Sequence, residues 1–76
     1  NLHAAKDGVL ADIRFAPEIE AKIFRKVFYK KRGDPVSYFN GANKALGIVF
    51  MRFASLAEMQ DRLNRINQLI TIDVLS

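Results

Sequence analysis

The stretch SLAEMQDRLNRINQLITIDV, residues 55–74, has the pattern of a helix followed by a strand. Ser55 and Glu58 have the spacing of a capping box. In this motif the Ser side chain accepts a hydrogen bond from the backbone amide of the Glu, the Glu side chain accepts one from the backbone amide of the Ser, and a helix begins there. The apolar residues that follow recur every three or four positions and make one stripe: Leu56, Met59, Leu63, Ile66 and Ile70. At the end of the stretch the period changes to two, which is typical of a strand. We therefore predict an amphipathic helix over Ser55–Leu69 and a strand over Ile70–Val74.

Two further strands are predicted upstream of this helix. Leu46–Phe53 is the most hydrophobic run of the chain, and such a run is typical of a central strand that is covered on both faces. Val9–Phe15 alternates apolar and polar side chains, as a half-buried strand does.

The segment between these strands permits two interpretations. Pro17 and the acidic residues after it favour a helix start, whereas the β-branched and aromatic residues over Ile23–Tyr29 favour a strand. We predict a helical turn over Pro17–Ala21 and a strand over Ile23–Lys31. A single helix through Lys31 is the alternative.

The remaining segments are turns by composition. Arg32–Pro35 and the pair Asn40-Gly41 carry turn-forming residues, and Val36–Phe39 between them has room for a brief strand pairing. The whole order predicts an α+β fold: a small antiparallel β-sheet with one amphipathic helix packed on one face (β-β-β-α-β). We expect a single domain over residues 1–76, with residues 1–7 as a loose lead-in.

Composition excludes several classes of protein. Half of the 76 residues are hydrophobic and 26% are charged, which argues against disorder. The chain has no cysteine, so disulfides and cysteine-based zinc sites are excluded. We find no apolar run long enough for a transmembrane helix and no signal peptide, and we expect a cytoplasmic protein. Because the sequence lacks a starting Met, we expect a piece of a longer chain.

The sequence offers no catalytic residue and no metal site. His3 is the only histidine and lies in the expected lead-in. The carboxylates are scattered, so surface or capping roles are expected for them rather than paired acid–base chemistry. Ser55 is a helix cap, not a nucleophile, and no glycine-rich phosphate loop is present.

The basic strand carries one functional hint. The net charge is +4, and on an extended strand one face would carry alternating basic and aromatic residues: Lys22, Phe24, Lys26, Phe28 and Lys30. Such interleaving can hold phosphates and stack bases. A small nucleic-acid-binding module using Lys22–Arg32 is therefore an alternative function. The same pattern also fits Phe24 and Phe28 packed against the helix or a neighbouring domain, with lysines that protect an edge strand from aggregation.

The polar loop Asn40–Gly47 brings the sequence close to a known family. Gly8-Val9-Leu10, Gly33-Asp34-Pro35-Val36, this loop, and Ser55-Leu56-Ala57-Glu58-Met59 before a closing strand together resemble the C-terminal module of ATP-grasp ligases. The similarity is greatest to the L-amino-acid ligase-like branch, and biotin carboxylase-like and carbamoyl-phosphate-synthase-like proteins are more distant. It covers nearly the whole chain from Gly8.

The resemblance implies an accessory domain of a larger enzyme. The parent would use ATP and magnesium to activate a carboxylate as an acyl phosphate for attack by an amine. Its nucleotide and metal ligands would lie in an upstream catalytic domain of the same chain, so this fragment would bind no cofactor itself. The loop residues Asn40, Asn43 and Lys44 are the candidates to lie near the substrate cleft. The isolated fragment is expected to expose an apolar patch and to have the capacity to form a homodimer.

Overall fold

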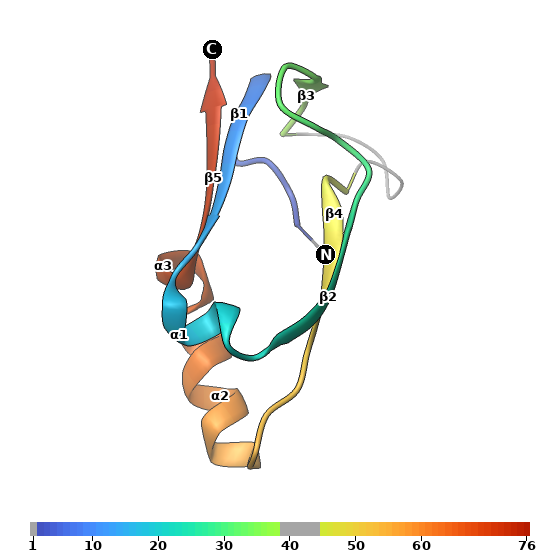
Figure 1. The fold of residues 1–76 in the computed structure, drawn as a ribbon. Helices are drawn as coiled ribbons and strands as arrows, with labels where there is room; N and C mark the ends of the chain where they lie inside the picture. Colours follow the sequence, from blue (N-terminus) through green and yellow to red (C-terminus); the bar gives the residue numbers. More distant parts are fainter. Residues whose placement is uncertain (1, 39–44) are drawn as a thin grey trace.

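The computed structural model describes residues 2–38 and 45–76 and has an α+β fold (Figure 1). The elements follow in the order β1 (Gly8–Phe15), α1 (Pro17–Glu20), β2 (Ile23–Phe28), β3 (Pro35–Val36), β4 (Gly47–Met51), α2 (Leu56–Asn64), α3 (Ile66–Leu69) and β5 (Ile70–Leu75). All strand pairs are antiparallel. The predicted fold class is therefore confirmed.

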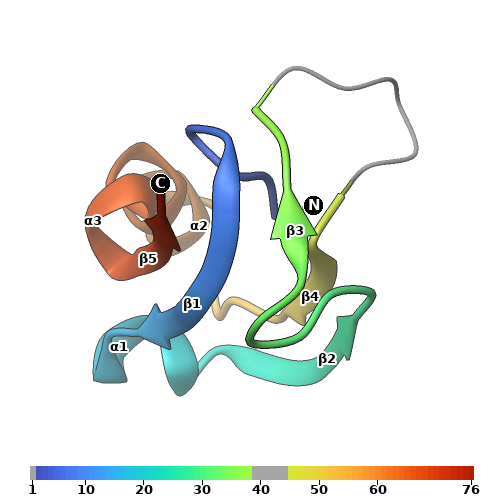
Figure 2. The same ribbon diagram turned by 90° about the horizontal axis from the view of Figure 1, so that it is seen from above.

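The strands of the described residues form two small sheets. The order of one is β3-β1-β5, and the other contains β2 and β4. Figure 2 shows the β2–β4 pair standing apart from β1 and β5. Leu46–Phe53 was predicted to be a central strand covered on both faces, and this detail is wrong. β4 pairs with β2 alone among the named strands, and Phe50 keeps 39% of its surface exposed.

Two residues of the expected loose lead-in, Leu2 and Ala4, contribute to the core, which corrects that part of the prediction. Leu2 and Ala4 are buried, with 7% and 5% of their surface exposed. The backbone of Leu2 donates to the carbonyl oxygen of Gly47 at 2.8 Å and accepts from the amide of Leu46 at 2.7 Å. The sequence alone does not indicate this role, because two apolar residues are too few to show a hydrophobic period.

The split predicted for residues 17–31 is confirmed. Pro17 begins α1 and the chain is extended again from Ile23, so the alternative of one long helix is wrong. β2 ends at Phe28 rather than at Lys31 because the next two amides, of Tyr29 and Lys30, both donate to the carbonyl oxygen of Leu46. With both amides bonded to one oxygen, the regular hydrogen bonding between β2 and β4 stops there.

The amphipathic helix begins at its predicted cap but is divided. Ser55 Oγ accepts a hydrogen bond from the amide of Glu58 at 3.1 Å. At Arg65 the backbone leaves the helical region (φ −109°, ψ 15°), which separates α2 from α3. No residue of α2 is buried, and Leu56 and Leu63 keep 64% and 44% of their surface exposed. The predicted stripe therefore packs on the molecule only in part.

The core lies between the two sheets and the helices. Its most buried side chains come from four parts of the chain: Leu10 on β1, Ile19 on α1, Leu46 just before β4, and Leu69 on α3. None of the buried residues in the described part of the chain is polar or charged. Hydrophobic contact thus joins the elements, while polar side chains lie at the surface.

Candidate functional site

Asn40, Asn43 and Lys44, the candidates for the substrate cleft, lie outside the described residues. Their proposed role stays a prediction. Three candidate features of the described residues are the β2–β4 sheet, the cleft between β1 and β2, and an ion-pair network between α1 and the α2–α3 junction.

The predicted basic and aromatic face of β2 is divided by a β-bulge. The register with β4 shifts between Ile23 and Arg25. After the shift Arg25 lies opposite Phe50, and Lys26 lies opposite Val49. Residues directly opposite in an antiparallel pair share a face, and Val49 packs against the core. Arg25 therefore lies on the outer face with Phe50, whereas Lys26 lies on the inner face, and the single face predicted for the strand is wrong.

Two of the three lysines of the predicted face, Lys22 and Lys26, are already paired. Lys22 Nζ lies 2.9 Å from Glu58 Oε1, and Lys26 Nζ lies 2.6 Å from Glu20 Oε1. The ammonium group of Lys26 also lies 4.3 Å from the ring centre of Phe15, a cation–π contact. These two lysines connect the β2 region to neighbouring elements, so they are poor candidates to bind a ligand.

Phe24, Arg25, Phe50 and Arg52 form a cluster on the outer face, which we call the aromatic–arginine face. The ring centres of Phe24 and Phe50 lie 6.2 Å apart with a tilt of 48°. The guanidinium of Arg25 lies 5.5 Å from the Phe50 ring centre, and that of Arg52 lies 4.9 Å from the Phe24 ring centre. Sequence reasoning found Phe24 but missed the other three, because a bulge and a partner strand bring them together.

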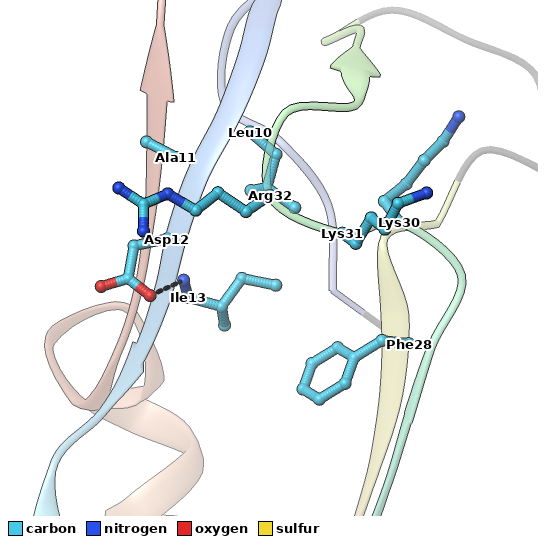
Figure 3. A pocket seen from close by; sticks show the side chains of 8 residues that line it. All are labelled: Leu10, Ala11, Asp12, Ile13, Phe28, Lys30, Lys31 and Arg32. Atoms are coloured by element: carbon cyan, nitrogen blue, oxygen red, sulfur yellow. Dashed lines mark hydrogen bonds between the residues drawn. The ribbon is translucent and has the colours of Figure 1, made fainter.

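A cleft of about 260 Å³ opens between the two sheets. Figure 3 shows Ile13 of β1 and Phe28 of β2 pointing toward one another across it, with Leu10 above. Lys30 and Lys31 extend away from β1, and the Asp12 carboxylate accepts a hydrogen bond from the Ile13 amide at 2.8 Å. Ligand pockets are usually larger than this. The cleft therefore suits one apolar side chain of a partner better than a whole small molecule.

A third cluster is an ion-pair network between α1 and the α2–α3 junction. Arg65 donates from both terminal nitrogens to the Glu18 carboxylate at 2.9 Å, and its Nη2 donates to Asp61 Oδ2 at 2.8 Å. The hydrogen bond from Arg65 holds the pKa of Glu18 below its ordinary value, and the same donor lowers the pKa of Asp61. Arg65 thus pairs both with Asp61, one helical turn before it, and with Glu18 on α1. The network joins helices and presents no free acid or base.

The described residues do not build a metal site. Within residues 2–38 and 45–76, no three His, Cys, Asp or Glu side chains come together as metal ligands. His3 is exposed. Within the same residues no helix is both long and apolar enough to span a membrane.

Comparison with known proteins identifies no relative. No family model matches the chain, and no curated protein or solved structure is significantly similar to it.

Proposed function

We propose that the chain is the C-terminal accessory domain of an ATP-dependent carboxylate–amine ligase of the ATP-grasp type. It packs on an upstream catalytic domain of the same cytoplasmic protein, closes part of the substrate cleft there, and performs no chemistry itself. ATP and magnesium belong to that catalytic domain, and no reaction step is assigned to the side chains of this chain.

The exposed apolar side of α2 is the observation that supports this proposal. A nine-residue helix with an apolar stripe and no buried residue leaves hydrophobic surface in water. Leu56 is 64% exposed and Leu63, two turns further on, is 44% exposed. Covering apolar surface is favourable by about 25 cal/mol per Å². Each side of an interface between domains of one chain buries roughly 300–750 Å², and such an interface would take up this surface.

The cleft between the sheets is consistent with the same role. Its walls at Ile13 and Phe28 are apolar and open to the surface, so a side chain of the catalytic domain has a place to insert. When the fragment is isolated, a second copy of the chain is the partner available to these surfaces. We therefore expect homodimers at high concentration.

The test uses the full-length parent and the double substitution Leu56→Ser with Leu63→Ser. We expect weaker packing between domains, seen as faster proteolysis at their junction, and a loss of carboxylate-dependent ADP release. In the isolated chain the same pair should change stability little, because both side chains are exposed. The matched control is Leu75→Ser, since Leu75 is also 64% exposed but lies at the end of β5.

Two results would count against the proposal. One is a parent protein that releases no ADP with any carboxylate and amine. The other is an active parent in which the α2 double variant and Leu75→Ser behave alike.

A further inference from the structure

We propose that the aromatic–arginine face binds single-stranded nucleic acid. Bases would stack on Phe24 and Phe50, and phosphates would bind to Arg25 and Arg52. This activity is separate from the accessory role proposed above and is tested on the isolated chain.

The rings of this face are available to a ligand. Phe24 is 58% exposed and Phe50 is 39% exposed, although both belong to paired strands. Each base has a flat π-face, so exposed aromatic rings bind successive bases with little sequence preference. Guanidinium planes also accept stacked bases. Two rings and two guanidinium groups within contact of one another thus make a continuous stacking surface.

The two arginines also carry charge that is not used elsewhere in the described structure. Lys22, Lys26 and Arg65 each pair with carboxylates, whereas Arg25 and Arg52 take part in none of the ion pairs of the described residues. Their guanidinium groups contact rings instead, which leaves their N–H groups for an anion.

The surrounding sequence favours a polyanion. Residues 21–33 contain six Lys and Arg and no Asp or Glu, and residues 45–57 contain Arg52 and no acid. Lys22 and Lys26 pair with carboxylates, so the charge beside the rings comes from Arg25 on β2 and from Arg52, which directly follows β4. An acidic peptide would use the charge, but it would leave the paired rings without a planar partner. Single-stranded nucleic acid uses both, so it is the occupant that we propose.

The experiment is a fluorescence-anisotropy titration of a labelled 12-nucleotide oligo(dT) with the isolated chain at low salt. Phe24→Ala should weaken binding by about fivefold or more, the effect of losing one stacked base. Arg52→Gln should weaken it and reduce the salt slope by about 0.7, the value for one phosphate contact on a single strand. Circular dichroism of each variant shows whether the fold is kept.

Two matched controls isolate the face. Phe28→Ala removes an aromatic residue of similar exposure (47%) from the cleft side of the same strand, and Arg14→Gln removes an arginine that pairs with Asp73 on the other sheet. Both variants should bind oligo(dT) with nearly the affinity of the unsubstituted chain. If Phe28→Ala loses as much affinity as Phe24→Ala, or if no binding occurs at low salt, the proposal is wrong. It is also wrong if poly-glutamate binds equally well and Phe24→Ala leaves both affinities unchanged.

Discussion

Single side chains at the start of α2 join the helix to the rest of the molecule. The Ser55 hydroxyl accepts from the Glu58 amide, while Glu58 Oε1 accepts from the Ala54 amide at 2.9 Å and contacts Lys22 Nζ at 2.9 Å. We expect Ser55→Ala to lower the free energy of unfolding by about 1 kcal/mol, because an amide at the helix start loses its acceptor. The melting temperature should fall by roughly 4–8 °C. Thermal melts followed by circular dichroism measure this change. The variant Ser55→Asp keeps an acceptor and should melt close to the melting temperature of the unsubstituted chain.

The sequence predicted half of this arrangement. Ser55 and Glu58 are three residues apart, so their contact is local and a pattern reveals it. Lys22 lies 36 positions before Glu58 in the sequence. Their ion pair depends on where the chain turns after α1, and no spacing rule contains that information.

Gly47 fixes the close approach of β2 and β4 at the scale of elements. A Cβ at this position would lie 2.6 Å from the carbonyl oxygen of Val27 and 3.2 Å from Cα of Phe28, both backbone atoms. We expect Gly47→Ala to separate the strands locally and cost about 1–3 kcal/mol of stability, as other overpacking substitutions do. Amide hydrogen exchange should accelerate in β2 and β4 and much less in β1 and β5. Equal acceleration in both sheets would contradict this explanation.

Strand positions followed from side-chain alternation, but the division into two sheets did not. Periodicity shows which residues are extended, whereas pairing depends on contacts distant in sequence. The bulge before Arg25 is one extra residue, and it reverses the faces of everything after it. This single irregularity explains why Phe24 and Phe28, predicted to lie together, lie on opposite sides of the sheet.

For the molecule as a whole, we expect the free energy of unfolding to fall as the pH becomes acidic. Glu18, Asp61 and Glu58 all have pKa values lowered by hydrogen bonds from Arg65 or the backbone. Because these pKa values are lowered by folding, the same carboxylates bind protons at a higher pH in the unfolded chain than in the folded one. The stabilisation is therefore complete above the ordinary Glu value of 4.5 and is lost as the pH falls below it. Urea unfolding at pH 6 and pH 3 measures the difference. Arg65→Leu should reduce that difference, and an unchanged difference would show that the network does not cause it.

The exposed side of α2 shows a limit of sequence reasoning. Leu56 and Leu63 have the same spacing whether they face the core of this chain or another domain. The sequence therefore predicted the helix and its stripe but not the surface that the stripe meets. The role of Asn40, Asn43 and Lys44 stays a prediction, and the aromatic–arginine face required the structure.

The two hydrogen bonds that join Leu2 to Leu46 and Gly47 also have a mechanical consequence. Tension applied at Leu2 would reach β4 at Gly47 before it reached β1, because Leu2 is hydrogen-bonded there. A truncated chain that starts at Gly8 would leave the Leu46 amide and the Gly47 carbonyl without their Leu2 partners. It would also remove Leu2 and Ala4 from the core. Expression boundaries and attachment points for force spectroscopy should therefore keep Leu2 and Ala4.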